Sequence, residues 1–95
     1  MSQLTVIAHI YANPGHEAEV KAELEKLIPI TRDEDGCLNY DLHTDNADPT
    51  HFVFHENWAS KSAMQNHLNA PHLKAFMKAV DSKIRDFTLY EMTPV

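Results

Sequence analysis

The chain has 95 residues and a formal net charge of −6, from 14 acidic and 8 basic side chains. This charge would repel a phosphate backbone, so we expect no nucleic-acid partner. No apolar run approaches the ~20 residues of a membrane span, and Cys37, the single cysteine, excludes a disulfide within the chain. We therefore expect a single domain over residues 1–95 that works away from membranes in the reducing cytoplasm.

The first half of the chain predicts a strand, a helix and a second strand. LTVIAHIYA (4–12) is rich in β-branched and apolar residues and predicts a strand. Apolar residues at helical spacing then predict a helix over 17–34 that ends at Gly36. CLNYDLHT (37–44) alternates and predicts a second strand, with Leu38, Tyr40 and Leu42 on one face and Asn39, Asp41 and His43 on the other.

The second half predicts a third strand, a bent helical segment and a last strand. HFVFHENW (51–58) predicts the third strand, and Ser60 is placed to cap a short helix through Leu68. Asn69 to Pro71 breaks this helix, and Pro71 suits the first turn of another. The last strand is FTLYEMT (87–93), and the helix before it has an apolar stripe of Leu73, Phe76, Met77, Val80 and Ile84.

The order of these elements predicts an α+β fold of the ferredoxin-like, split β-α-β-β-α-β type. It has a four-stranded antiparallel sheet with helices on one face. The first and third strands also have apolar side chains on their second face, among them Ile7, Tyr11 and Val53. Because the chain is too short to add another layer, a second subunit is expected to cover that face.

Four stretches of the sequence together resemble the antibiotic biosynthesis monooxygenase domain family, of the small bacterial quinol-monooxygenase-like type. They are PGHEAEVKAELEKLI (14–28), TRDEDGCLNYDLHTD (31–45), FVFHENWASKSAM (52–64) and HLNAPHLKAF (67–76). The resemblance covers nearly the whole chain and implies a dimeric α/β barrel, in which each subunit has a pocket between its own sheet and helices. It also implies oxidation of a phenol or quinol by O2 without flavin, haem or metal. Other branches of the family isomerise or cleave small signalling metabolites.

The third strand carries the first group of candidate site residues. Alternation puts Phe54, Glu56 and Trp58 on one face, which the resemblance directs toward the pocket. The Trp58 ring is expected either to form a flat wall for an aromatic substrate or to fill the core. Asn57 points to the opposite face unless a bulge redirects it, and is kept as a candidate for substrate binding.

Histidines supply the candidate bases. His67 shares a helix side with apolar residues and is expected to point inward, as a general base or as a structural side chain. His9 is the second candidate, because the resemblance sets its strand beside the third strand, where it is expected to pair with Glu56. His72 is expected either at the pocket mouth or in solvent. Tyr40 and Phe76 complete the predicted substrate-binding set.

Metal and nucleotide sites are not expected. His51 and His55 lie about 13 Å apart on a strand, too far to share one ion. His67 and His72 straddle a helix break and so lack a helical ligand spacing. Glu34 is interpreted as a brace for the end of the first helix.

The sequence therefore predicts a homodimeric, cofactor-independent monooxygenase that oxidises a small phenolic or quinol substrate with O2 to a quinone. Glu56, His9 and His67 are the candidate catalytic residues. The alternative is a non-oxidative isomerase, or a ligand-binding protein, for a small signalling keto-sugar or lactone in the same pocket.

Overall fold

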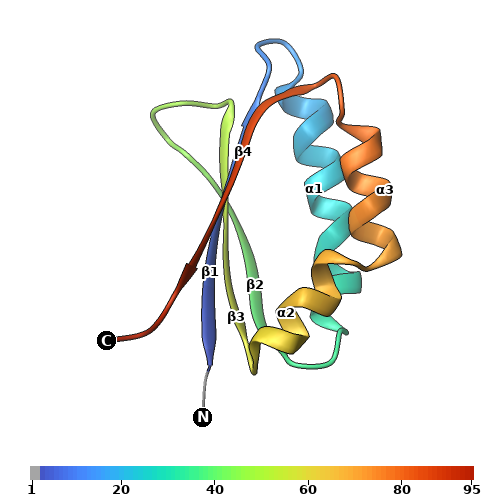
Figure 1. The fold of residues 1–95 in the computed structure, drawn as a ribbon. Coiled ribbons are helices and arrows are strands. Elements are labelled where there is room, and N and C mark those ends of the chain that lie inside the picture. Colours follow the sequence, from blue (N-terminus) through green and yellow to red (C-terminus); the bar gives the residue numbers. More distant parts are fainter. Residues whose placement is uncertain (1–2) are drawn as a thin grey trace.

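The computed structural model describes residues 3–95. These residues fold into four strands and three helices, whose arrangement Figure 1 shows. In chain order these are β1 (Leu4–Ala12), α1 (Glu17–Arg32), β2 (Cys37–Thr44), β3 (His51–Trp58), α2 (Lys61–Leu68), α3 (Pro71–Ala79) and β4 (Ile84–Met92). The first three strands have the bounds that the sequence predicted.

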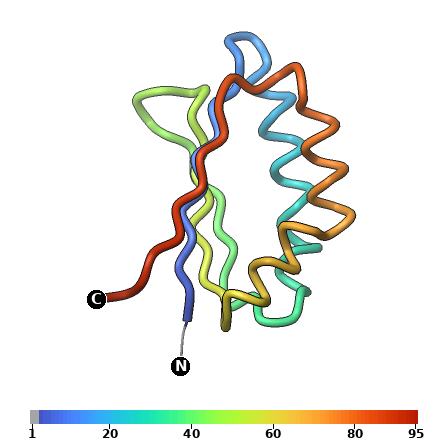
Figure 2. Tube along the Cα trace, in the orientation of Figure 1, coloured from blue at the N-terminus to red at the C-terminus, as the bar shows by residue number. Residues whose placement is uncertain are grey.

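The strands form one antiparallel sheet in the order β2-β3-β1-β4, which confirms the ferredoxin-like α+β prediction. All three helices lie on one face of this sheet, and the other face is open (Figures 1 and 2). The core lies between the helices and the sheet, because every second side chain is buried from Val6 onward in β1 and from Phe52 onward in β3. Glu56 and Trp58 lie on the helix-facing side of β3, with Phe52 and Phe54.

The helices form where amphipathic spacing and capping favour them. In α1, Val20, Leu24 and Leu27 are buried at helical spacing. At the start of α2 the Ser60 hydroxyl accepts a hydrogen bond from the Ala63 backbone N–H at 3.1 Å, as the sequence predicted. Pro71 begins α3 after the predicted break. Among residues 3–95, no helix has both the length and the apolar character to cross a membrane.

Two predicted helix ends are wrong. Helix α1 ends at Arg32, with Asp33 as its C-cap, so Gly36 belongs to the following turn. Helix α3 stops at Ala79, and Ile84 begins β4, where it pairs with Ala12. The predicted α3 stripe was therefore too long, because it assigned the first residue of β4 to the helix.

A bulge in β2 overturns the predicted position of Leu38. Cys37 pairs with Trp58 and Asn39 with Asn57, so Leu38 is the extra residue in this strand and is 56% exposed. Tyr40 keeps its predicted inward face and is buried. Because of the bulge, the inward-facing positions of β2 include Cys37 and Tyr40, and Leu38 between them points outward.

The open face of the sheet is a mixture of apolar and polar side chains. Ile7, Tyr11 and Val53 are half-buried and alternate with the buried positions of β1 and β3, as predicted. Polar networks lie between them: the Thr5 hydroxyl donates to Asn57 at 2.6 Å, and a nitrogen of His9 lies 2.8 Å from one of His51. This face is therefore less apolar than the sequence pattern suggested.

We predict that Gly36→Ala destabilises the fold more than Gly15→Ala. Both glycines have positive φ, +82° and +91°, so either substitution places an L side chain in left-handed backbone at a cost of about 1–2 kcal/mol. Only at Gly36 would the new Cβ meet another atom, the Ala63 Cβ at 2.6 Å, which adds about 1–3 kcal/mol of overpacking. Urea unfolding of the two variants measures the difference, and equal destabilisation would contradict the close approach of the Gly36 turn to α2.

Candidate functional site

A narrow cavity lies between the sheet and the helices. Its volume of about 20 Å³ leaves room for about one water molecule. Its walls come from all three helices and from every strand of the sheet, and consist of Ala8, Ile10, Leu24, Leu27, Tyr40, Phe54, Glu56, Met64, His67, Leu68, Leu73, Phe76, Phe87 and Leu89. Tyr40, Glu56 and His67 are the polar members of this set.

Glu56 is a buried carboxyl group on the cavity wall. It is 3% exposed, and its Oε1 accepts a hydrogen bond of 2.9 Å from Trp58 Nε1. Burial raises the pKa of Glu56 to about 7, against the lowering effect of the Trp58 hydrogen bond and with a smaller contribution from Glu34. Glu56 therefore changes between a hydrogen-bond donor and a proton acceptor near neutral pH.

Trp58 does not line the cavity, so of its two predicted roles, a wall for an aromatic substrate or a core side chain, the structure favours the second. The side chain is 0% exposed, and its ring packs against the His67 ring at a centroid distance of 4.8 Å. Its indole N–H donates the hydrogen bond to Glu56 described above. Trp58 thus orients two cavity side chains without facing the cavity itself.

His67 is held by a carboxylate that comes from the turn after α1. His67 Nδ1 lies 2.8 Å from Glu34 Oε2, and the imidazole is 3% exposed. Because Glu34 accepts at Nδ1, the lone pair of the neutral ring is on Nε2. Burial lowers the pKa of His67 more than the Glu34 contact raises it, so the ring is neutral at neutral pH.

His72 does not line the cavity and is half-buried, so it has neither of its two predicted places, the pocket mouth or solvent. Its Nε2 is 2.7 Å from the same oxygen of Glu34 and 3.4 Å from the Thr31 hydroxyl oxygen. Glu34 therefore accepts from two histidines on different helices. Thr31, which is fully buried at the end of α1, adds a further polar contact.

The remaining predicted aromatic residues do line the cavity. Phe54 and Phe76 contribute buried rings, and the Tyr40 ring stacks on Phe54 at a centroid distance of 4.2 Å. Burial raises the pKa of Tyr40 far above its usual range, so its phenol stays protonated and can donate. Its ring also meets the His67 ring edge-on at 5.4 Å.

His9 and Asn57 lie on the open face of the sheet, away from the cavity. The predicted His9–Glu56 pair does not form, because His9 is opposite Val53 in the register and belongs to the other face. Its ring stacks on His51, and His51 in turn contacts Asp45 at 2.9 Å. Asn57 accepts a hydrogen bond from the Thr5 hydroxyl and donates one to Asn39. Strand adjacency alone did not determine which face of β1 meets the pocket.

Glu34 is the functional candidate that the sequence reasoning missed. It lies 33 residues before His67, in a turn that reads as a helix end, and no local pattern marks it. The helix break that argued against a His67–His72 pair brings the two rings to a centroid distance of 5.9 Å. One oxygen of Glu34 and one nitrogen of each histidine lie within 4.8 Å of one another, so these three side chains could hold a metal ion.

Comparison with known proteins finds a matching family and similar sequences. The profile described as "Antibiotic biosynthesis monooxygenase" matches residues 3–79. The Escherichia coli (strain K12) protein named "Probable quinol monooxygenase YgiN" is 32% identical over 101 residues, covering 96% of this chain and 97% of that protein.

Solved structures agree with the sequence relatives. The crystal structure of PA3566 from Pseudomonas aeruginosa superimposes with a TM-score of 0.96 and 33% identity, covering 100% of this chain and 96% of that one. The structure of Rv0793 from Mycobacterium tuberculosis has a TM-score of 0.92 and 28% identity, covering 99% and 96%.

We predict that the stability difference between the protein and its Glu56→Gln variant depends on pH. The raised pKa means that the folded state holds this proton more tightly than the unfolded chain, whose Glu pKa is about 4.3. The protonated Glu56 carboxyl therefore adds its full contribution to the free energy of unfolding below about pH 4.3, and this contribution is lost as the pH rises through about 7. Urea unfolding at pH 5 and pH 8 should show the variant gaining on the order of 2 kcal/mol relative to the parent at the higher pH.

A direct titration provides the control. The side-chain carboxyl carbon of Glu56, followed by NMR, should have a midpoint near 7, and its resonance is identified by its loss in Glu56→Gln. In Trp58→Phe, which removes the indole donor, the midpoint should move upward. A midpoint below about 5 in the parent protein would contradict the burial of this group, because unburied Glu titrates near 4.3.

Proposed function

This chain belongs to the antibiotic biosynthesis monooxygenase family and is a monooxygenase, and we propose that it oxidises a small phenol or quinol to a quinone with O2 and without a metal or organic cofactor. The observation that carries the proposal is the pair of proton-accepting side chains, Glu56 and His67, on the wall of an apolar cavity. The Escherichia coli relative, whose printed name contains the words quinol monooxygenase, supports the choice of substrate class.

The composition of the cavity favours an aromatic substrate with a hydroxyl group. Apart from Tyr40, Glu56 and His67, every lining residue is apolar. Phe54 and Phe76 offer faces and edges to a ring, while the three polar side chains offer proton donors and acceptors to its oxygen.

His67 is our candidate for the general base. Nδ1–H of His67 donates a hydrogen bond of 2.8 Å to Glu34. The lone pair of Nε2 is therefore free to accept a proton. The lowered pKa keeps the ring neutral before reaction, and the adjacent carboxylate stabilises the imidazolium that forms. Glu56 is the second candidate, because its pKa of about 7 also makes it a usable base.

The protein needs to supply a base because triplet O2 reacts slowly with a neutral phenol. Once the hydroxyl proton is on His67, the phenolate passes one electron to O2, and the resulting superoxide and phenoxyl radical recombine at a ring carbon. His67 returns its proton to the peroxide, and the O–O bond and the ring C–H bond break, which releases water and leaves a second carbonyl. One oxygen atom enters the product and one leaves as water, so phenol and O2 give quinone and water. The dry cavity favours recombination over escape of superoxide.

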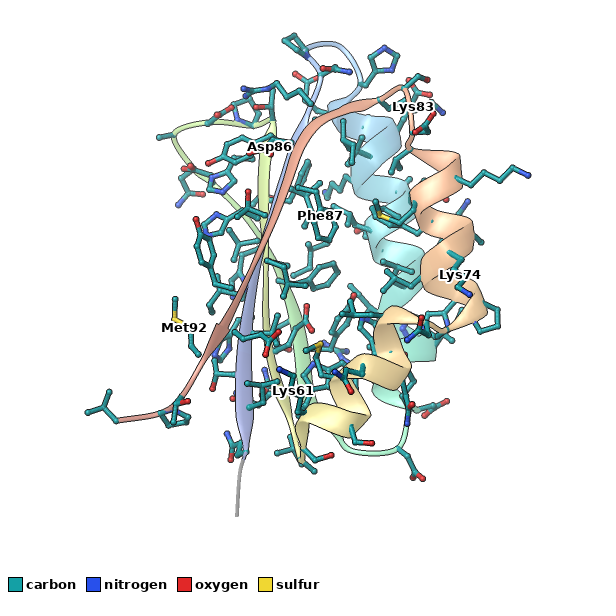
Figure 3. The ribbon with its side chains drawn as sticks, viewed as in Figure 1. Lys61, Lys74, Lys83, Asp86, Phe87 and Met92 are labelled. Carbon is teal, nitrogen blue, oxygen red and sulfur yellow. The ribbon has the colours of Figure 1, made fainter. Side chains whose placement is uncertain are left out.

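A ring can enter only if the cavity opens, because its present volume is close to that of one water molecule. Leu68, Leu73 and Phe87 line both the cavity and an outer groove with Lys74 and Met77. Figure 3 shows Phe87 projecting from β4 into the space between the sheet and the helices, with Lys74 on the facing helix. These three shared side chains are the gate that we expect to move.

We further propose that a second copy of the chain covers the open sheet face. Ile7, Tyr11 and Val53 supply apolar area there, and Tyr90 and Met92 on β4 are each 47% exposed. The hydrogen-bonded polar groups between them are already paired within the sheet, so burying them costs little further free energy.

We predict that His67→Gln lowers turnover by about 10²- to 10⁴-fold, the usual effect of removing a general base. Glutamine can still bond to Glu34 but cannot accept a proton, so substrate binding should fall much less than turnover. The matched control is His16→Gln, at an exposed His–carboxylate pair at the start of α1, which should keep the parental rate. Steady-state kinetics on a panel of phenols and quinols measures the effect.

Two results would revise this assignment. If His67→Gln keeps full turnover while Glu56→Gln loses it, the base is Glu56. If conversion of the true substrate continues undiminished without O2, or if ¹⁸O₂ leaves no label in product and water, the oxidative reaction is wrong. The isomerase or ligand-binding alternative then replaces it.

We predict that the protein has twice the chain mass of 10.8 kDa by light scattering at micromolar concentration. Val53→Glu places a charge on the open face and should produce the monomer. Ile30→Glu, at a residue that is 49% exposed on the outside of α1, should leave the dimer intact. A monomeric parent protein would rule out this interface.

A further inference from the structure

Glu34, His67 and His72 form a compact cluster of potential metal ligands at the junction of α1, α2 and α3. Glu34 Oε2 lies 2.8 Å from His67 Nδ1 and 2.7 Å from His72 Nε2, and all three ligand atoms lie within 4.8 Å of one another. The three residues come from separate segments, so the fold holds the ligand atoms together independently of any one helix.

The donor set is one that transition metals use in proteins. Two imidazoles and one carboxylate bind Zn²⁺ in sites where water takes the fourth position, and the same set binds non-haem iron. Tetrahedral Zn²⁺ with bonds of 2.0–2.1 Å separates its ligand atoms by about 3.3 Å. The two contacts to Glu34 would therefore lengthen by about half an ångström, and the two histidine nitrogens would approach each other, which small side-chain rotations can supply.

The cluster is open to solvent on one side. The Glu34 and His72 side chains are 17% and 16% exposed, whereas His67 is 3% exposed. His72 also lines a surface groove between α1 and α3 with Leu27 and Phe76. An ion can thus reach Glu34 and His72 from water without passing through the apolar cavity.

From this geometry we propose that Glu34, His67 and His72 bind a divalent transition-metal ion of the Zn²⁺ type, and that the bound ion inhibits the enzyme. An ion on His67 Nδ1 uses the lone pair of that nitrogen, so the remaining ring proton must sit on Nε2. A protonated Nε2 cannot accept the substrate proton. The inhibitory consequence rests on the proposed function of His67 as base, whereas the ion site itself does not.

Binding is tested first without substrate. The chelator-treated protein is titrated with Co²⁺, followed by its ligand-field absorption, and with Zn²⁺ by calorimetry. We expect saturation at one ion per chain. Glu34→Gln and His72→Gln should each weaken binding by at least about 10- to 100-fold, because even residues that only support metal ligands have effects of this size. Circular dichroism verifies the fold of each variant.

His16→Gln is the matched control. The His16–Glu19 pair, with a separation of 2.9 Å, offers one histidine and one carboxylate on the surface but no second histidine. This variant should bind Co²⁺ and Zn²⁺ as the parent protein does. Absence of saturable binding, or binding that survives both Glu34→Gln and His72→Gln, overturns the proposed site.

Turnover separates this inference from the proposed function. Chelator-treated enzyme that keeps its rate and loses it on adding one equivalent of Zn²⁺ supports the inhibitory site. Saturable Zn²⁺ binding with no change in rate overturns the inhibition. A chelated enzyme that is inactive until Fe²⁺ is added also overturns the inhibition, and the proposal that the enzyme needs no cofactor fails with it, although the ligand assignment stands.

Discussion

Burying ionisable side chains in an apolar cavity is the constraint on which the rest of this structure depends. A carboxyl group and an imidazole lose their hydration there, so each requires a polar partner inside the protein. Glu56 has the indole N–H of Trp58, and His67 has the carboxylate of Glu34. These partners are themselves buried or half-buried, so the site extends one layer behind the atoms that would meet a substrate. The same desolvation raises the pKa of Glu56 to about 7 and lowers the pKa of His67, so that His67 is neutral before any proton arrives.

The two faces of the sheet carry different kinds of side chains. The helix-facing side gathers the apolar walls of the cavity, and the β2 bulge at Leu38 allows both Cys37 and Tyr40 to face inward beside β3. The open side carries an Asn39–Asn57–Thr5 network and an Asp45–His51–His9 chain of hydrogen-bonded side chains. Neighbouring residues on β3 therefore have different surroundings: Glu56 lines the cavity, and Asn57 belongs to the network on the open face.

The bend between α2 and α3 brings two histidines to one carboxylate. Because Pro71 starts a new helix after the break, His67 and His72 approach Glu34 from two directions. With protons on the ring nitrogens that face it, the carboxylate fixes the tautomer that leaves His67 Nε2 available as a base. With a metal ion in place of those contacts, the same three side chains would hold the opposite tautomer. In both proposals, what the half-buried carboxylate of Glu34 binds decides whether His67 can accept a proton.

The sequence alone was sufficient for the elements and the fold class, because the alternation of β1 and β3, the Ser60 cap and the Pro71 break are local signals. The same alternation correctly put Phe54 and Glu56 on one face of β3 and Asn57 on the other, and the family resemblance directed the first of these faces toward the helices. Helical spacing correctly turned His67 inward. Only the tertiary structure decided which side chains meet. It set His9 opposite Val53 and away from Glu56, put Trp58 behind the cavity wall, and brought Glu34 to His67 and His72. These outcomes depend on strand register, a bulge and the angle between two helices, which arise from packing between residues far apart in the chain and leave no periodic trace in the sequence.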